Sequence, residues 1–114
     1  MDDNRKYLPD IVRKIRKINP SKIILFGSYA RKSFSEDSDL DLFVVLDSPE
    51  ISKNYDERMR NKLLVRRIIY DLTKKVPIDL LVYTKGEYDV ISKSESSFYK
   101  EIQDSGEILY EKGD

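Results

Sequence analysis

The sequence predicts an α/β (α+β) fold in which helices pack against a small β-sheet. Short apolar runs typical of strands recur along the chain. Segments with apolar residues three or four positions apart, typical of amphipathic helices, stand between them. A chain of 114 residues has room for about one core, so we expect residues 1–114 to form a single domain.

The N-terminal half predicts two helices and two strands. Apolar residues at helical spacing among lysines and arginines indicate a helix over 8–18. "KIILFGS" (22–28) indicates a buried strand that ends at a glycine turn, and "SDLDLFVVLD" (38–47) a second strand. A long amphipathic helix should follow over 51–72. Its apolar stripe would consist of Ile51, Tyr55, Met59, Leu63, Leu64, Ile68 and Leu72.

The C-terminal half predicts two further strands and two helices. "VPIDLLVYT" (76–84) indicates a third strand, with Pro77 near its start where a missing N–H is tolerated. Residues 85–93 are expected to be helical, and "SSFYKEIQDSG" (96–106) indicates another helix that stops at Gly106. The short strand "EILYE" (107–111) completes the sheet.

Composition limits the chemistry that the chain can perform. It has no cysteine and no histidine, which removes thiolate nucleophiles, imidazole bases and the usual zinc ligands. Lysine plus arginine and aspartate plus glutamate both number 21, so no global field favours nucleic acid or anionic lipid. We found neither a signal-peptide pattern nor a membrane-spanning run, and therefore expect a cytoplasmic protein that does not bind membranes and has no direct nucleic-acid role.

Two aspartates on an otherwise apolar strand are the most unusual feature. Because side chains alternate along a strand, Asp39 and Asp41 should project from one face, about 6.6 to 6.8 Å apart, with Asp37 close before them. The opposite, core-facing set would be Leu40, Leu42, Val44 and Leu46. Two carboxylates on one face repel each other and gain most from a shared hard cation.

A third acid and a glycine turn extend the pattern. Asp79, between Ile78 and Leu80, would join the other two on one sheet surface if its strand pairs beside theirs. Three acids can hold two Mg²⁺ ions roughly 3.5 to 4 Å apart, an arrangement used in phosphoryl displacement. Gly27 and Ser28 could offer backbone N–H groups and a hydroxyl to phosphate oxygens.

The stretch "GSYARKSFSEDSDLDLFVV" resembles the active-site motif of the minimal nucleotidyltransferases, a branch of the polymerase-beta-like superfamily. In that motif Gly-Ser and Asp-x-Asp are separated by ten residues, here 29–38. "IDLLVY" resembles the family's third-acid strand, and "FYKEIQDSGEILYEK" resembles its C-terminal tail. The resemblance covers nearly the whole chain and implies the family's fold, a small mixed sheet flanked by helices.

The resemblance also implies a mechanism. Asp39, Asp41 and Asp79 would bind Mg²⁺, with two ions expected and Mn²⁺ as an alternative, while Asp79 helps to deprotonate an attacking hydroxyl. Gly27 and Ser28 would hold the triphosphate of ATP. Further contacts are expected from Arg31 to phosphate and from Ser38 to an aspartate or the nucleotide. Family members often have glycine where this chain has Lys32, which leaves nucleotide preference and rate open.

The family implies a partner as well. A domain this small lacks a large acceptor-binding region, so the acceptor should bring its own surface. In the family, such domains commonly serve as antitoxins that transfer AMP from ATP to a tyrosine hydroxyl of a HEPN-type RNase toxin. A non-catalytic antitoxin or nucleotide-binding module that acts by contact, and a small-molecule nucleotidyltransferase, are the alternatives. Homo-oligomeric and hetero-oligomeric states both stay open.

Simpler interpretations were weighed for each motif. Asp39 and Asp41 could lie on a solvated edge strand, although the glycine turn and third acid argue against this. An EF-hand loop beginning at Asp37 fails because position six is Leu42 and position twelve is Ser48. Arg31 could form a surface salt bridge. The basic run "RMRNKLLVRRIIYDLTKK" favours a solvated helix face, with contact to RNA or an acidic partner surface as the alternative.

Overall fold

The computed structural model describes residues 4–32 and 38–113. Its strands are β1 (Lys22–Phe26), β2 (Leu40–Leu46), β3 (Ile78–Thr84) and β4 (Glu107–Glu111). Its helical segments are η1 (Asn4–Tyr7), α1 (Leu8–Ile15), η2 (Arg16–Ile18), α2 (Gly27–Ala30), α3 (Tyr55–Ile68), α4 (Tyr70–Thr73), α5 (Lys85–Ser92) and α6 (Ser97–Ser105). The predicted element order and α/β class are confirmed.

The four strands form one mixed sheet in the order β3-β2-β1-β4. Strand β1 is antiparallel to both of its neighbours, whereas β2 and β3 are parallel. A parallel pair needs a long crossover, and α3 and α4 supply it between these two strands. The strand that carries Asp79 therefore lies at a sheet edge, directly beside the strand that carries Asp41.

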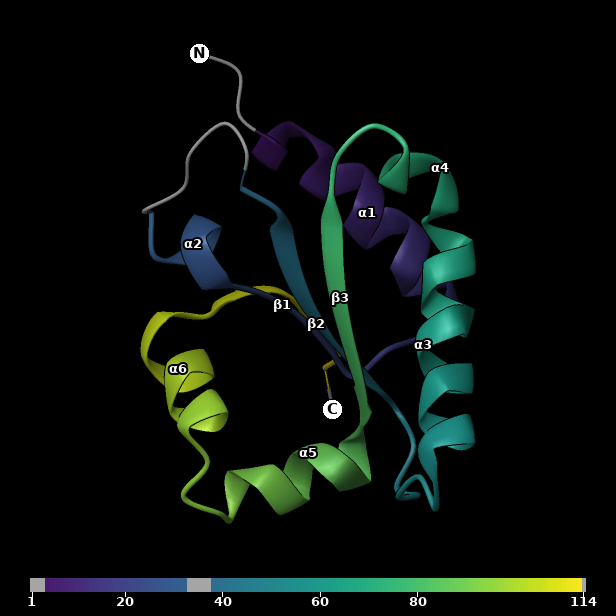
Figure 1. Cartoon of the computed structure of the whole chain (residues 1–114), viewed down its shortest axis with the longest axis vertical. Helices are drawn as coiled ribbons and strands as arrows, with labels where there is room; N and C mark the ends of the chain where they lie inside the picture. The colour runs from purple at the N-terminus through teal and green to yellow at the C-terminus, as the bar shows by residue number, and fades with distance from the viewer. Residues whose placement is uncertain (1–3, 33–37, 114) are drawn as a thin grey trace.

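Helices cover both faces of the sheet (Figure 1). On one face, α1 and α3 bury a core that includes Ile11, Ile15 and Leu42. On the other face, α5 and α6 pack against a smaller cluster that includes Phe43 and Ile102. Phe43 follows Asp41 on the same side of β2, so this face changes from acidic at the start of the strand to apolar further along. On this face of the sheet, Asp41 therefore lies near the start of β2, and the apolar cluster lies further along the strand.

The long helix confirms the predicted element. The predicted apolar stripe is confirmed at Leu72, which is buried, and at Ile68, which packs against the core, but it is wrong at its exposed members. Helix α3 begins at Tyr55 rather than near Ile51, and α4 follows it after a one-residue break at Ile69. Exposed members of the predicted stripe are Ile51, Tyr55, Leu63 and Leu64. The buried residues are Val65, Ile69 and Leu72, because their side of the helical segment joins the core that packs on the sheet.

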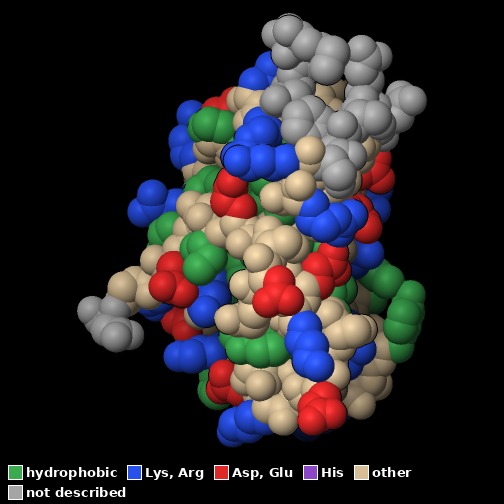
Figure 2. All heavy atoms as spheres, turned by 90° about the vertical axis from the view of Figure 1, so that its left-hand side faces the viewer, with side chains coloured by type: hydrophobic (Ala, Val, Ile, Leu, Met, Phe, Trp, Pro, Cys, Tyr) green, Lys and Arg blue, Asp and Glu red, His purple; other side chains and the backbone are tan. Residues whose placement is uncertain are grey.

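The surface carries mixed charge. On the face that bears α2 and α6, acidic and basic side chains are interspersed, and hydrophobic side chains form only small patches (Figure 2). This distribution agrees with the equal numbers of acidic and basic residues in the chain. Among the helices of residues 4–32 and 38–113, none has the length and apolar character needed to cross a membrane.

Candidate active site

The Gly27 turn connects β1 to α2 at one end of the sheet. Gly27 has a φ of +72°, in the left-handed region that favours glycine, and it follows Phe26 at the end of β1. The backbone then forms one helical turn, closed by a hydrogen bond of 3.0 Å from the Arg31 N–H to the Gly27 carbonyl. Ser28 lies on this turn and is half-buried. The predicted strand and glycine turn are both present.

The turn lies directly against Asp41. Phe26 pairs with Asp41 in the antiparallel register of β1 and β2, which brings the next residue, Gly27, close to the aspartate side chain. A Cβ atom at Gly27 would overlap Oδ2 of Asp41. Gly27 is therefore needed twice, once for its backbone conformation and once for the space that Asp41 occupies.

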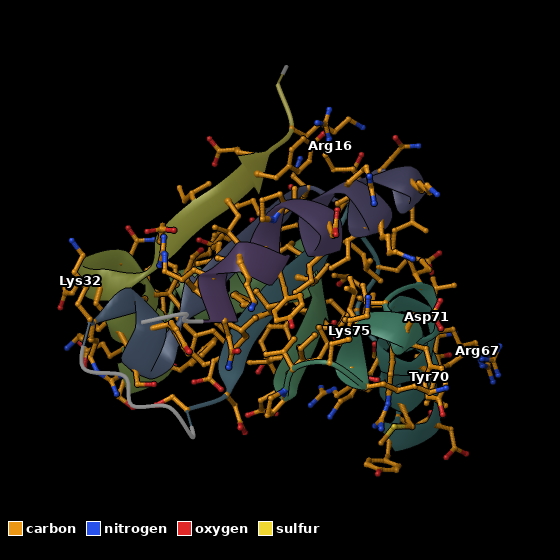
Figure 3. All side chains as sticks on the ribbon, turned by 90° about the horizontal axis from the view of Figure 1, so that it is seen from above. Arg16, Lys32, Arg67, Tyr70, Asp71 and Lys75 are labelled. Atoms are coloured by element: carbon orange, nitrogen blue, oxygen red, sulfur yellow. The ribbon has the colours of Figure 1, made fainter. Side chains whose placement is uncertain are left out.

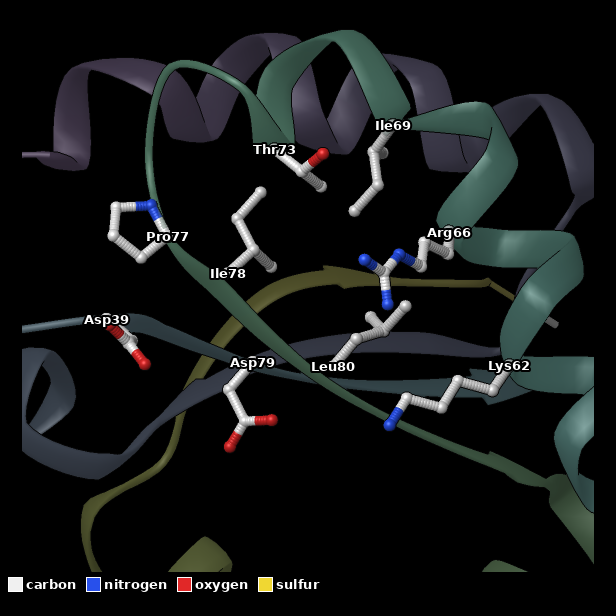
Figure 4. A pocket seen from close by; sticks show the side chains of 9 residues that line it. All are labelled: Asp39, Lys62, Arg66, Ile69, Thr73, Pro77, Ile78, Asp79 and Leu80. Atoms are coloured by element: carbon white, nitrogen blue, oxygen red, sulfur yellow. The ribbon is translucent and has the colours of Figure 1, made fainter.

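Strand pairing brings the acids together. Asp41 lies opposite Asp79 in the parallel register of β2 and β3, and Asp39 is two residues earlier in the chain. Asp39 and Asp79 line one cavity of about 320 Å³, where Figure 4 shows both carboxyl groups. Both residues are exposed, whereas Asp41 is half-buried. The sequence-based condition for a three-acid site, that the third strand pairs beside the second, is met.

The three acids influence one another electrostatically. The pKa of Asp41 is raised above its usual value, first because burial disfavours the charged form and then because Asp79 and Asp39 repel that charge. Arg31 acts in the opposite direction, and Glu101 adds to the rise. An ionised carboxylate held beside two others gains stability from a cation that neutralises all three.

The donor set fits a hard divalent cation in its chemistry. Carboxylate oxygens are the ligands that Mg²⁺ and Mn²⁺ prefer. Asp41 and Asp79 supply them from paired positions of β2 and β3, and Asp39 supplies them from just before β2. Among residues 4–32 and 38–113, no three acidic side chains are gathered into a finished ligand cluster.

Arg31 and Ser38 are the two further residues predicted to contact the nucleotide or the acids. Arg31 forms an ion pair of 2.6 Å with Glu101 of α6, so its guanidinium already has a protein partner. The alternative of a surface salt bridge for Arg31 is thus realised, with an acid distant in sequence rather than one from the nearby loop. Ser38 directly precedes Asp39 and is half-buried. Asp37 lies outside the described residues.

Lys32 adopts an unusual backbone conformation after α2. Its φ of +60° lies in the left-handed region, where a Cβ atom is disfavoured. Its N–H donates to the Tyr29 carbonyl at 3.3 Å, which places it just beyond the helical turn, a position where glycine is common. The chain therefore keeps a glycine-like conformation at the position where the resemblance suggested glycine.

Sequence reasoning missed the basic wall of the cavity. Lys62 and Arg66 of α3 line it together with Asp39 and Asp79 (Figure 4). Their four-residue spacing within the basic run places them on one helix face, which the sequence does reveal. Which of the several basic residues would turn toward β3 depended on the packing of α3 on the sheet, which the sequence did not reveal. The sequence also did not reveal that Glu101 pairs with Arg31, because that contact depends on how α6 packs.

Comparison with known protein families identifies a nucleotidyltransferase domain, as the sequence motif suggested. Residues 5–109 match the family model described as "Nucleotidyltransferase domain". A protein of Methanocaldococcus jannaschii with the provisional name protein adenylyltransferase is 33% identical over 89 residues, which is 78% of this chain and 77% of the relative.

Solved structures share the fold. A provisionally named nucleotidyltransferase from Sulfolobus solfataricus superposes with a TM-score of 0.62 at 22% identity, over 94% of this chain and 79% of that chain. A toxin–antitoxin structure with AMP-PNP gives a TM-score of 0.59 at 16% identity, over 92% and 73% of the two chains. A mutant of the toxin–antitoxin MntA-HpeT gives 0.55 at 14% identity, over 92% and 73%. At these identities the likeness concerns the fold.

Proposed function

We propose, from the premise that this chain belongs to the nucleotidyltransferase domain family, that it transfers AMP from ATP to a hydroxyl group of a partner protein in a Mg²⁺-dependent reaction. One observation carries the proposal. Asp41 lies opposite Asp79 in the strand register while its carboxyl group abuts Gly27, so the acids and the glycine turn form one continuous site. The family assignment makes nucleotidyl transfer the chemistry that this arrangement serves.

The proposed roles follow from position. Gly27 and Ser28 would bind the triphosphate through backbone N–H groups of the turn and the Ser28 hydroxyl. Asp39, Asp41 and Asp79 would hold Mg²⁺. When bound, Mg²⁺ supplies positive charge that offsets the negative charge of the phosphates. Ser38 would orient an aspartate or contact the nucleotide, and Arg31 would reach phosphate if it exchanged Glu101 for that anion.

The reaction would be a single displacement. The acceptor oxygen forms a bond to the α-phosphorus, the bond to the β-phosphate oxygen breaks, and pyrophosphate leaves with that electron pair. Asp79, at the sheet edge and exposed to the cavity, would take the hydroxyl proton. Most of the rate gain would come from positioning and charge neutralisation, which suits a chain without histidine.

The proposed acceptor is a tyrosine hydroxyl of a HEPN-type toxin, which the transfer would silence, so that this chain acts as an antitoxin. Two findings support this choice: the similar Methanocaldococcus jannaschii protein is named as a protein adenylyltransferase, and structures of similar fold are toxin–antitoxin proteins.

The test is to incubate the purified protein with α-³²P-labelled ATP, CTP, GTP or UTP and Mg²⁺, with and without its co-purifying partner, and to separate the products on a denaturing gel. We expect label on the partner from ATP alone, and none with Asp39→Asn/Asp41→Asn. A stable complex that silences the partner without label would favour the contact antitoxin. Label on added small molecules and not on protein would favour a small-molecule enzyme.

A further inference from the structure

The cavity beside Asp79 has walls of opposite charge. It measures about 320 Å³ and lies between the start of β3 and the helical segments α3 and α4. Asp39 and Asp79 line one side, and Lys62 and Arg66 extend toward it from α3 (Figure 4). Apolar side chains, among them Ile69, also line the cavity. The cavity thus combines an acidic edge, an apolar floor and a basic wall.

The cavity and the glycine turn lie on opposite sides of the acids. In the strand order β3-β2-β1-β4, the Gly27 turn follows β1, whereas the cavity borders β3 at the sheet edge. Strand β2, which begins between Asp39 and Asp41, separates them. The cavity therefore offers a second substrate a route to Asp79 from the side of α3, away from the Gly27 turn.

Lys62 and Arg66 are available for a ligand. Their spacing of four residues places them on one face of α3. Within residues 4–32 and 38–113 neither forms an ion pair, although Arg58, on the same helix, lies 3.8 Å from Glu87. Two unpaired cations in a concave site bind anionic groups more strongly than cations on an open surface do, because the surrounding protein limits screening by water.

We propose that this cavity binds an acidic polypeptide segment that carries the acceptor hydroxyl, with Lys62 and Arg66 pairing with carboxylates that flank it; this inference rests on the proposed function. The apolar floor suits an aromatic or aliphatic side chain of the acceptor. A polypeptide fits better than RNA, because no aromatic ring occurs among the described residues that line the cavity, so bases would have no surface on which to stack.

The test measures binding rather than transfer. Two fluorescent tyrosine peptides of equal length, one flanked by glutamates and one by lysines, are titrated with the protein in Mg²⁺ and a non-hydrolysable ATP analogue. Lys62→Glu/Arg66→Glu is compared with Arg67→Glu, a matched control on the same helix that does not line the cavity and points outward (Figure 3). Lys62→Gln/Arg66→Gln gives a second variant with a milder charge change, and thermal unfolding verifies that each is folded.

We expect the wild-type protein to prefer the acidic peptide. Lys62→Glu/Arg66→Glu should weaken that binding by roughly tenfold or more, because each reversal replaces an attraction with a repulsion. The glutamine variant should weaken it less, and Arg67→Glu should leave it nearly unchanged. Affinity for the ATP analogue, measured without peptide, should be the same in all four proteins.

Several results would overturn the inference. These are no preference for the acidic peptide, an equal loss in Arg67→Glu, a loss of ATP-analogue affinity in the cavity variants, or tighter binding of a single-stranded RNA that depends on Lys62 and Arg66. Each of them leaves the proposed function standing if the wild-type protein binds the analogue. Failure of the wild-type protein to bind the analogue at all would instead overturn the proposed function, and this inference with it.

Discussion

Gly27 and Asp41 are packed so closely that a Cβ atom at Gly27 would overlap Oδ2 of Asp41. The backbone of Gly27 is also in the left-handed region, with φ of +72°. The glycine of the turn and the half-buried acid of the site therefore constrain each other. Replacing the glycine should disturb the acid as well as the turn.

Gly27→Ala should both destabilise the protein and stop nucleotidyl transfer. The left-handed conformation alone costs alanine roughly 1–2 kcal/mol, and displacement of Asp41 adds to that cost. Urea unfolding gives the change in stability and the labelling assay gives the activity. Gly113→Ala is the matched control, because a Cβ there meets nothing within 4 Å. Wild-type stability and activity in Gly27→Ala would show that the turn and Asp41 are not coupled.

Asp41→Asn should abolish transfer while slightly raising stability at neutral pH in the absence of divalent cations. The raised pKa of Asp41 means that the folded protein binds this proton more tightly than the unfolded chain does. The resulting stabilisation is complete below pH 3.8, the usual pKa of an aspartate, and is lost as pH rises through the higher pKa of the folded state. Above that range, ionised Asp41 opposes folding.

Thermal unfolding from pH 3 to pH 8 in EDTA tests this expectation. The advantage of Asp41→Asn over wild type should appear as pH rises and should shrink when Mg²⁺ is added, because the cation stabilises only the carboxylate form. Asp104→Asn, an exposed position on α6, serves as the control. A variant that is less stable than wild type across the whole pH range would contradict the electrostatic account of the site.

Lys32→Gly should stabilise the protein by about 1 kcal/mol or less. Glycine relieves the left-handed conformation at φ of +60°, although its greater freedom in the unfolded chain offsets part of the gain. Lys32→Ala removes the same charge but keeps the Cβ atom, so it should give no comparable gain. Equal stabilisation by both variants in urea unfolding would assign the effect to charge rather than to the backbone.

Glu87→Ala should destabilise the fold by about 1–3 kcal/mol at neutral pH without touching the candidate site. The carboxylate accepts hydrogen bonds from the N–H groups of Thr84, at 2.8 Å, and Ser52, at 3.2 Å. Thr84 Oγ1 accepts from the Glu87 N–H at 3.1 Å, which completes a capping box for α5. Asp89→Ala, exposed on the same helix, is the control.

The effect of Glu87 should depend on pH. Burial is the largest single influence and acts to raise the pKa of Glu87, but the hydrogen bonds from Thr84 and Ser52 outweigh it and leave the pKa lowered. The contribution of Glu87 to stability is therefore present above pH 4.5, the usual pKa of a glutamate, and is lost as pH falls through the lower pKa of the folded state. The stability difference between wild type and Glu87→Ala should narrow on acidification. A constant difference would rule out this linkage.

Local periodicity was enough to predict much of the site. A strand offers only two faces, so the alternation in "SDLDLFVV" placed Asp39 and Asp41 together without knowledge of any neighbour. The position of Asp79 depended on one further condition, that β3 pairs beside β2, and this condition is met. The Gly27 turn could also be predicted from the sequence, because a glycine followed by a serine marks the end of an apolar run.

Features that depend on tertiary packing could not be predicted from the sequence. Contact with the core buries Val65 and Ile69, which the predicted stripe left out, beside Ile68 and Leu72, which it included. The Arg31–Glu101 ion pair joins residues 70 positions apart. The basic wall formed by Lys62 and Arg66 became visible only once the buried side of α3 was known.

The intact mass of the partner protein after incubation with ATP and Mg²⁺ tests the central claim most directly. With the wild-type chain, the partner should gain the mass of an adenylyl group, which is AMP less one water, and fragmentation should place it on a tyrosine. With Asp41→Asn, correctly folded and still bound to the partner, no mass should be gained. Transfer by Asp41→Asn at the wild-type rate, or a partner that is silenced by the wild-type chain with its mass unchanged, would contradict the three-aspartate mechanism.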